Sequence, residues 1–456
     1  MSQMLKKICK TIEKHGMISL GDSVLVALSG GADSVCLLKL LCELRQKYNL
    51  RICAAHLNHM IRGTDADRDA QFARQLCRKL GVHFYLEKAD VIKYAEENFL
   101  TTEEAGRILR YNFFDRICRE NSISKIATAH NLNDNTETVL MRFIRGTGID
   151  GLCGIPYVNG NVIRPLLDTS RQEIEAFLCE TEQDFVTDKT NGEAIYFRNK
   201  IRLNLIPEIK KEYNPNFTET LSSNISIYRQ AADFLDCEVR KKTERLIKYK
   251  KNYMEIELSE LKKEKDFIIS KTIAYALSKT ELKKQITSKI ISEICEIAKS
   301  GTGRVQFSKD VYVCAMYDRL YFVTKTQDKP FCTEINNFEK IYIKECDKTI
   351  TFTKAQKKEK NKNAIYVDLD KLFGKKIIVR SRKDKDVFIP SGMKGRKKLK
   401  DFFIDKKVPF FVRDEIPIFL ADDEIFCIGT MRESENYKAG CNTLNLLKIE
   451  ISDGGR

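Results

Sequence analysis

The chain has 456 residues, of which 43% are hydrophobic and 31% charged, and a formal net charge of +15. This length predicts two to four domains with real cores, and the composition is that of a soluble globular protein. No run of about 18 apolar residues occurs and the N-terminus lacks an apolar signal region, which excludes a membrane helix and a secretory signal. The positive charge indicates a polyanionic partner, and nucleic acid fits best.

The fifteen cysteines are scattered singly through predicted helices and strands, and no C-x-x-C pair occurs. This spacing argues against zinc ribbons and iron–sulfur ligation. We therefore expect reduced thiols, mostly in cores, and a cytoplasmic protein.

The first 190 residues alternate between strand-like and helix-like segments. Strands are predicted at 23–28, 51–56, 82–87 and 125–129, and helices at 33–48, 65–80, 101–120 and 132–145. Such alternation predicts an α/β fold with a doubly wound parallel sheet, in which ligands bind at the carboxyl ends of the strands.

The loop after the first predicted strand is the most informative segment. An apolar run from Val24 to Leu28 breaks into Ser29-Gly30-Gly31, and a helix then opens at Asp33 and Ser34. Free N–H groups and the helix dipole both point into such a turn, which makes it an anion site. A plain strand-to-helix turn is the alternative. The two serines and the aspartate favour a nucleotide phosphate, although no Walker motif with its lysine is present.

Two further segments carry polar groups toward the same edge. Residues 56–63, which begin with His56, follow the second strand, where a nucleotide would lie. In the helix over 101–120, Glu103, Arg107 and Arg110 share one face by their spacing of four and three. A salt-bridged surface stripe is the alternative for this helix.

The segment after the fourth strand supplies a second aspartate. His130 and Asp134 are four residues apart on the next helix, and Asn131 is a candidate N-cap. A capping cluster would explain these residues without any function. However, Asp33 and Asp134 at adjacent strand ends are well placed for Mg²⁺, which prefers a few carboxylates together with phosphate oxygens and water.

The pattern of predicted secondary structure changes twice in the rest of the chain. From about 215 to 300 the pattern is helical, followed by short strand-like pieces. Residues 351–363 are polar and lysine-rich and are predicted to be a linker, with strand-like runs after it. Residues 351–410 hold 19 Lys and Arg against 7 Asp and Glu. Lysines alternate with aromatics over 392–409, as in a surface that binds tRNA, although a solvated helix face is the alternative.

Taken in order, these segments resemble one family, the tRNA(Ile)-lysidine synthases, and the loop over 29–34 resembles the SGGxDS loop of the PP-loop ATP pyrophosphatases. The other resembling segments are 56–63, 103–111, 127–138, 145–152, 164–171, 197–207 and 392–417. Gly106 departs from the pattern, which has alanine there. The resemblance implies a Rossmann-like catalytic domain over 1–214, a mainly helical tRNA-binding domain over 215–350, the linker, and a basic α+β tRNA-binding domain over 364–456.

The resemblance also implies a reaction and its participants. It implies an ATP-dependent carbon–nitrogen ligase that joins free L-lysine to C2 of the wobble cytidine of tRNA(Ile) with a CAU anticodon. An adenylated cytidine is the intermediate, AMP and pyrophosphate are released, and Mg²⁺ is the metal. ATP contacts are expected from Ser29, Gly30, Gly31, Ala32, Asp33, Ser34 and His56. Catalytic roles are expected for Asp33, Asp134, His130, Arg107 and Arg110, with the two aspartates as metal ligands. Contacts to tRNA are expected from Arg198, Arg202, Lys394, Arg396, Lys397 and Lys398.

Two other functions are the alternatives to this one. A tRNA thiolase usually needs cysteine pairs, and the chain has no C-x-x-C. A non-catalytic RNA-binding protein with a relic loop would not need Ser29, Asp33, Ser34 and Asp134 all intact. The sequence leaves open whether the chain forms a homodimer, which residues bind lysine, and which base deprotonates it.

Overall fold

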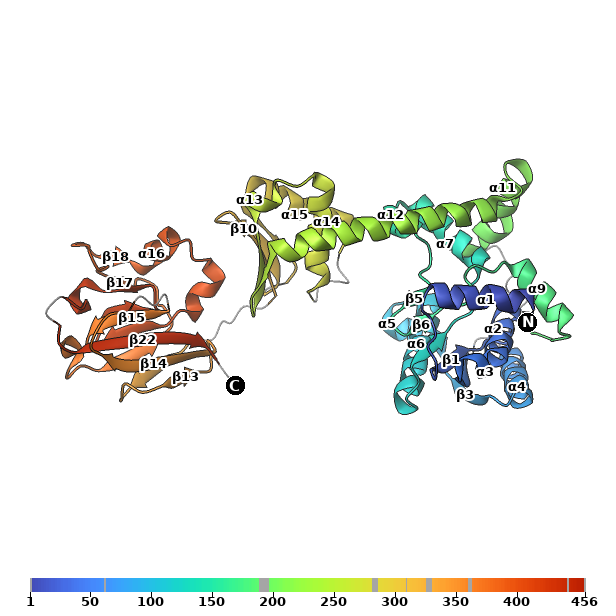
Figure 1. The fold of residues 1–456 in the computed structure, drawn as a ribbon, viewed down its shortest axis with the longest axis horizontal. Helices are drawn as coiled ribbons and strands as arrows, with labels where there is room; N and C mark the ends of the chain where they lie inside the picture. Colours follow the sequence, from blue (N-terminus) through green and yellow to red (C-terminus); the bar gives the residue numbers. More distant parts are fainter. Residues whose placement is uncertain are drawn as a thin grey trace. The chain divides into compact units, whose positions relative to one another are not determined.

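The computed structural model describes residues 2–60, 63–187, 197–280, 286–308, 310–324, 330–359, 363–440 and 443–454. The chain forms two compact units, Met1–Asp236 and Cys237–Arg456. Figure 1 shows the helices and strands of each unit, coloured along the sequence.

A six-stranded sheet organises the first unit, in the order β3-β2-β1-β4-β6-β5. All neighbouring pairs are parallel except β5 with β6. The strands are β1 (Ser23–Ala27), β2 (Arg51–Asn58), β3 (His83–Lys88), β4 (Lys125–Ala127), β5 (Val158–Asn159) and β6 (Val162–Ile163). The chain runs outward from β1 to β3 and then returns to the other side of β1 with β4. This reversal is the place where ligands bind in open α/β sheets.

Helices cover both faces of this sheet (Figure 1). They are α1 (Gln3–Lys14), α2 (Ala32–Glu43), α3 (Arg45–Tyr48), α4 (Thr64–Lys79), α5 (Val91–Asn98), α6 (Thr102–Glu120), α7 (Leu132–Arg145), α8 (Ile149–Leu152) and α9 (Arg171–Glu180). Side chains alternate along β1: Val24 and Val26 pack with α1, α2 and α9, whereas Leu25 packs with α6. The predicted doubly wound parallel sheet is confirmed.

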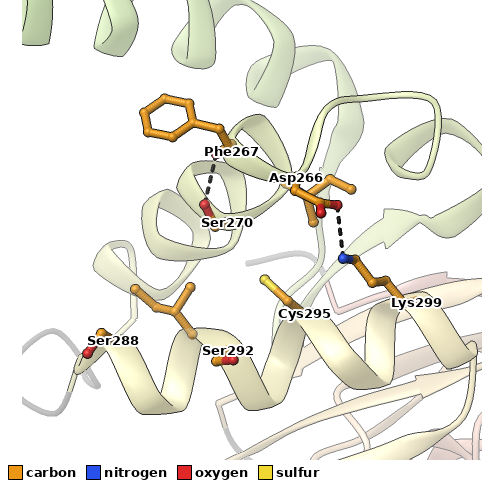
Figure 2. Close-up of a pocket in the computed structure, with 9 residues that line it drawn as sticks. Asp266, Phe267, Ser270, Ser288, Ser292, Cys295 and Lys299 are labelled. Carbon is orange, nitrogen blue, oxygen red and sulfur yellow. Dashed lines mark hydrogen bonds and ion pairs between the residues drawn. The ribbon is translucent and has the colours of Figure 1, made fainter. Parts of the chain in front are cut away.

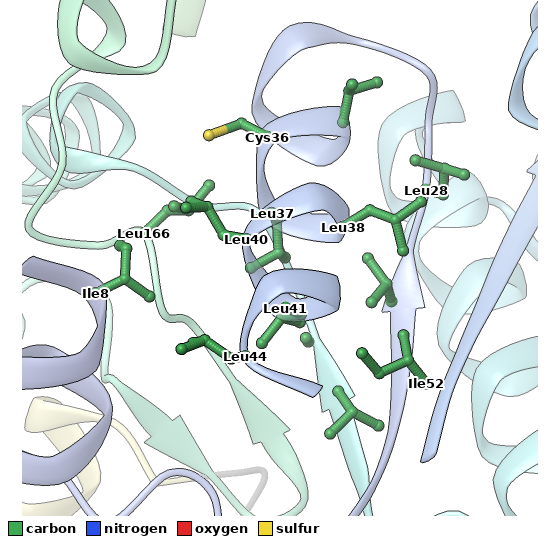
Figure 3. Packing of buried hydrophobic residues seen from close by; sticks show 14 of the residues in the cluster. Ile8, Leu28, Cys36, Leu37, Leu38, Leu40, Leu41, Leu44, Ile52 and Leu166 are labelled. Carbon is green, nitrogen blue, oxygen red and sulfur yellow. The ribbon is translucent and has the colours of Figure 1, made fainter. Parts of the chain in front are cut away.

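Helix α2 is apolar on most of its surface because it lies between the sheet and other elements. Figure 3 shows Leu38 beside Leu28 and Ile52, and Leu40 and Leu44 on the side of Leu166 and Ile8. Fully burying one leucine side chain contributes about 1.5–3 kcal/mol. The helix that follows the loop is therefore fixed firmly against β1, and so is the loop.

The first unit ends in helices: α10 (Phe197–Lys200), a π-helical turn η2 (Ile201–Leu205), α11 (Ile206–Glu212) and the first part of α12 (Phe217–Leu246). Arg229 on α12 donates hydrogen bonds to the carbonyls of Cys153 (2.8 Å) and Ile155 (2.6 Å), and its guanidinium lies over the ring of Tyr157. These contacts attach the long helix to the sheet.

The second unit begins with a five-stranded sheet in the order β7-β8-β11-β10-β9. Its elements are β7 (Ile247–Tyr249), β8 (Tyr253–Glu257), α13 (Leu258–Leu261), α14 (Asp266–Ser278), α15 (Ser288–Ser300), β9 (Gly303–Gln306), β10 (Tyr312–Met316) and β11 (Arg319–Val323). Helices α14 and α15 pack with the sheet in one core. The region after residue 215, which was predicted to be mainly helical, therefore contains helices packed on a five-stranded sheet.

The remainder of the second unit holds a five-stranded, a four-stranded and a two-stranded sheet. The elements are β12 (Cys332–Ile335), β13 (Ile341–Ile343), β14 (Lys348–Ala355), β15 (Ala364–Asp368), η4 (Asp370–Leu372), β16 (Ile377–Arg380), β17 (Val387–Phe388), β18 (Lys397–Lys398), α16 (Leu399–Asp405), η5 (Phe410–Glu415), β19 (Ile418–Ala421), β20 (Glu424–Ile428), β21 (Arg432–Glu433), η6 (Glu435–Tyr437) and β22 (Leu446–Asp453). The expected α+β domain is present.

The structure corrects two details of the domain organisation. Residues 351–355, expected in the linker over 351–363, are the second half of β14, which pairs with β22 along its whole length. Alternate buried residues such as Ile350 and Phe352 pack in the core, and the flanking lysines hid this pattern. The first compact unit also extends beyond the expected boundary at 214, to Asp236, because α12 continues across it.

Candidate active site

The loop over 29–34 turns tightly at the carboxyl end of β1. Gly30 has φ +93°, a conformation that favours glycine. The buried Ser34 hydroxyl accepts hydrogen bonds from the backbone N–H groups of Ser29 and Gly30, both at 3.2 Å, and donates to the Gly31 carbonyl at 2.9 Å. No side chain caps the N-terminus of α2. Its first N–H groups, including that of the buried Ala32, therefore point into the loop as an anion site requires.

The two predicted aspartates lie together across the switch point. Asp33 accepts a hydrogen bond from Asn131 Nδ2 (3.1 Å), and the Asn131 backbone N–H donates to Asp134 (3.0 Å). Asp33 also pairs with Arg171 at the start of α9 (2.7 Å). Burial raises the pKa of Asp33, the neighbouring Asp134 charge raises it further, and Arg171 opposes both. The N-termini of α2, α7 and α9 thus meet around two carboxylates.

An ion cluster adjoins Asp134. Arg198 and Arg202 bond to Asp134 (2.7 and 3.2 Å) and also to Glu137, whose side chain is 1% exposed. The two arginines come from α10 and the π-helical turn η2, and π-turns are frequent at functional sites. The tRNA contacts expected of these arginines stay a prediction, and in the structure both guanidiniums are held by carboxylates.

His130 lies among arginines. Its Nδ1 is 3.0 Å from the Thr128 hydroxyl. Burial, together with the smaller effect of the nearby positive charges of Arg164, Arg198, Arg107 and Arg110, lowers the pKa of His130 to about 3. The imidazole is therefore neutral at pH 7. The structure thus brings His130, Arg107 and Arg110 into one neighbourhood, as expected.

The helix that carries Arg107 and Arg110 packs closely on the loop after β2. Arg107 is exposed and stacks on Tyr111 (5.0 Å), whereas burial lowers the pKa of the half-buried Arg110. A Cβ atom at Gly106 would lie 3.4 Å from His59 Cε1. Glycine at this position, the departure noted in the sequence, leaves room for the His59 ring.

His56 occupies a supporting position. Its side chain is 7% exposed, and Nδ1 donates a hydrogen bond to the Leu28 carbonyl at 2.8 Å. This contact ties the end of β2 to the residue just before the loop. His56 thus helps to shape the loop through Nδ1, and the ATP contact expected of it stays a prediction.

Comparisons with known proteins identify the family of the chain. The family model of the PP-loop domain matches residues 2–209, and that of the TilS substrate C-terminal domain matches residues 377–448. A tRNA(Ile)-lysidine synthase from Caldanaerobacter subterraneus subsp. tengcongensis is 35% identical, and one from Clostridium tetani is 37% identical; each comparison covers 98% of both chains. The chain belongs to the tRNA(Ile)-lysidine synthase family.

Solved structures give a more distant likeness to this family member. A U34-tRNA thiolase from Methanococcus maripaludis with its [4Fe-4S] cluster has a TM-score of 0.42 and 20% identity, over 50% of this chain and 78% of that chain. Across the described ranges, no helix is both long and apolar enough to span a bilayer.

The basic tail of this lysidine synthase family member differs from expectation in one respect. Lys394, Arg396 and Lys398 are exposed, whereas Lys397 pairs with Asp405. The aromatic residues of the segment that follow this cluster are core residues: Phe402 and Phe403 pack, together with the earlier Phe388, against β19 and β20. The alternation of lysine and aromatic residues therefore reflects one buried and one exposed face, and the expected aromatic docking surface is not formed by these rings.

Three residues of the site, Glu137, Arg164 and Arg171, have no role assigned from the sequence. Glu137 and Arg171 lie in the segments that resembled the family, and the structure pairs them with the expected tRNA-binding arginines and with Asp33. Arg164 is 4% exposed, donates to the Pro156 carbonyl (2.7 Å), and its buried Nε has no partner in the structure. An arginine as the first residue of a helix opposes the helix dipole, a signal that could have singled out Arg171.

The two aspartates fit a magnesium ion only if the phosphates of a bound nucleotide supply further ligands. Among the described residues, no group of three or more His, Cys, Asp and Glu side chains is arranged to hold a metal. Mg²⁺ is commonly bound by one or two carboxylates together with substrate phosphates and water. Asp33 and Asp134, which both contact Asn131 beside the loop, match that pattern.

A groove in the second unit is separate from these residues. Figure 2 shows it between α14 and α15, with a volume of about 480 Å³. The Asp266–Lys299 ion pair (2.9 Å) closes one end, and Phe267 and Cys295 face the groove. None of the residues expected in the active site lines it.

Proposed function

We propose that this chain is an ATP-dependent ligase that joins the ε-amine of free lysine to C2 of the wobble cytidine in tRNA(Ile) with a CAU anticodon. One observation carries the proposal: an anion-binding loop, two carboxylates and an arginine-surrounded neutral histidine meet at the switch point of the sheet. Membership of the lysidine synthase family over nearly the full chain supports the substrates.

In the first step, the cytidine C2 carbonyl oxygen attacks the α-phosphorus of ATP. A bond forms between that oxygen and phosphorus, the bond to the β-phosphate oxygen breaks, and pyrophosphate leaves. Phosphoryl transfer needs positioning and charge neutralisation more than covalent help from side chains. The uncapped N–H groups at the start of α2 hold the phosphates. Asp33 and Asp134 would hold Mg²⁺, which would supply charge neutralisation.

In the second step, the lysine amine attacks C2. The new C–N bond forms, the bond from C2 to the adenylate oxygen breaks, AMP leaves, and the nitrogen gives up a proton. Free lysine is protonated at pH 7, so it must lose a proton before attack. With its pKa lowered to about 3, His130 is too weak a base for that proton. We assign it, with Arg107 and Arg110, to orienting the base and the phosphates.

The RNA must bring one base into this site. The anticodon nucleotide has to leave its stack, as in other enzymes that act on a base. The exposed Lys394, Arg396 and Lys398 are offered as contacts to the phosphate backbone. A reducing cytoplasmic location is part of the proposal, supported by cysteines that are unpaired among the described residues.

The test follows AMP formation by the purified chain with ATP, Mg²⁺, lysine and a tRNA(Ile) transcript. AMP should form with the CAU anticodon and should not form when the wobble cytidine is replaced by uridine. AMP release that is independent of that cytidine would contradict the proposal. A thiolase would instead release AMP with sulfide in place of lysine.

A further inference from the structure

The phosphate loop has an unusual charge balance. A triphosphate brings about four negative charges, yet residues 29–34 contain no lysine or arginine and do contain Asp33. The cation that the structure bonds to the loop comes from elsewhere in the chain: Arg171 Nη1 lies 2.7 Å from Asp33 Oδ2. This inference rests on the proposed use of ATP and concerns what Arg171 does when ATP arrives.

Arg171 is placed by backbone contacts that do not depend on its charge. Its N–H donates to the Asn133 side chain (3.0 Å), and the Leu132 N–H donates to the Thr169 carbonyl (2.9 Å). These bonds fix the start of α9 against the start of α7. The guanidinium therefore projects beside the loop from a rigid base.

The position is a poor one for a purely structural arginine. Arg171 is the first residue of α9, where the helix dipole repels a positive charge. Its side chain is 39% exposed and that of Asp33 is 27% exposed, and half-exposed ion pairs add little to stability. An anion in the loop would be attracted to the same place by α2, α9 and the guanidinium.

Both oxygens of Asp33 are already bonded, one to Asn131 and one to Arg171. A divalent cation at Asp33 would be repelled by the positive guanidinium on the same carboxylate, and the cation therefore competes with Arg171 for Asp33. Arg171 has room to turn away from Asp33 because its side chain is 39% exposed, and its Nε bond to the exposed Glu175 (2.7 Å) keeps the guanidinium at the surface of the site.

We propose that Arg171 exchanges partners: it neutralises Asp33 in the ligand-free protein and binds the β- and γ-phosphate oxygens when ATP occupies the loop, which leaves Asp33 to the divalent cation. Arg171 then supplies the cation that the loop lacks. The same contact holds the pyrophosphate as it leaves.

The proposal predicts opposite effects of one substitution on two ligands of the full-length chain. The first probe is α,β-methylene ATP, which is not cleaved, titrated calorimetrically in EDTA. The second is Mn²⁺ alone, followed by electron paramagnetic resonance. R171Q should weaken the nucleotide analogue about tenfold or more, because a charge-assisted contact is lost. The same substitution should raise the affinity for Mn²⁺ several-fold, because the Arg171 guanidinium no longer competes with the metal for Asp33. R171K keeps the positive charge but lacks the paired N–H donors of the guanidinium, so its affinities for both ligands should lie between those of the unsubstituted chain and R171Q.

The matched control is K7Q, in which Glu173, on the same helix α9 as Arg171, loses the ion pair with Lys7 of α1, whose side chain has a similar exposure to that of Arg171. It should change neither affinity. Partner exchange would be overturned if R171Q left the affinity for either ligand unchanged, or if it lowered the affinities for both the nucleotide analogue and Mn²⁺. If the unsubstituted chain binds no analogue with or without Mn²⁺, the proposed function itself fails, and this inference with it.

Discussion

At the scale of single residues, the site consists of carboxylates that are held in place by arginines and by one asparagine. Asp33 and Asp134 each contact Asn131, and arginines neutralise both. The carboxylates are consequently fixed in position before any ligand binds. Such preorganisation is what phosphoryl transfer requires of a protein.

Replacing Asp33 with asparagine separates function from stability. D33N should reduce Mg²⁺-dependent ATP turnover about 100-fold, since a metal ligand contributes several kcal/mol to the transition state. The free energy of unfolding should change by less than about 1 kcal/mol, because the ion pair with Arg171 is half-exposed. Turnover assays and urea unfolding test both parts. Retained turnover would remove Asp33 from the metal site.

His130 makes stability depend on pH. Its pKa is lowered to about 3, mainly by burial, against about 6.5 in an unfolded chain. Between these values only the unfolded chain binds the proton, so His130 makes the free energy of unfolding fall as the pH drops from 6.5 toward 3. H130Q should therefore lose less stability than the unsubstituted chain between pH 7.5 and pH 5 in urea titrations. Equal losses would show that His130 is not held neutral.

How much of the site the sequence predicts depends on the kind of contact. Asp33 follows β1 and Asp134 follows β4, which pairs with β1, so topology alone brings the two aspartates together. The arginine partners are different: Arg171 and Arg198 are 138 and 64 residues from the aspartates they bind. No local pattern encodes such pairs. The bond from His56 Nδ1 to the Leu28 carbonyl, 28 residues away in the sequence, is another contact without a local pattern.

At the scale of helices, two capping boxes offer a matched comparison. Thr101 caps α6 and Asn131 caps α7, each with a reciprocal bond to the third helical residue. T101A and N131A should each cost about 1 kcal/mol of stability. Only N131A should also impair ATP turnover, because Asn131 donates to Asp33. Thermal unfolding and turnover of both variants test this. Equal turnover would mean that Asn131 is a cap and nothing more.

The strands and helices of the first unit follow their sequence patterns closely. β1 begins at the predicted Ser23, and α7 occupies the predicted 132–145, because hydrophobic periodicity and capping act there together. The prediction failed at β14, where lysines and threonines on the exposed face resembled a linker. Such a strand is specified by its partner β22, which lies nearly a hundred residues away and leaves no local signal.

At the scale of the whole molecule, the positive charge should act through the RNA. Replacing Lys394, Arg396 and Lys398 with alanine should weaken tRNA binding and reduce the slope of log affinity against log salt by about 3. Adding K397A should change little, because Lys397 pairs with Asp405. Filter binding over a range of salt concentrations tests this, with ATP affinity as the control. An unaltered slope would show that the cluster does not meet phosphate.

Aromatic contacts join the two parts of the second unit. Phe411 of η5 packs edge-on against Tyr253, Tyr312 and Tyr321, at ring distances of 5.2–6.3 Å. F411A should lower the stability of this unit by about 3 kcal/mol and split its calorimetric transition in two. The exposed Phe373 is the matched control, and F373A should do neither. A single transition in F411A would show that other contacts suffice.

The most direct test of the central claim is transfer of radiolabelled lysine to tRNA. The purified chain is incubated with labelled lysine, ATP, Mg²⁺ and tRNA(Ile) bearing CAU, and acid-precipitable label is counted after mild alkaline deacylation. We predict label that is retained, requires ATP, and disappears when the wobble cytidine is changed to uridine. No label, with AMP still formed, would contradict lysine as the nucleophile while leaving the activation of the base in place.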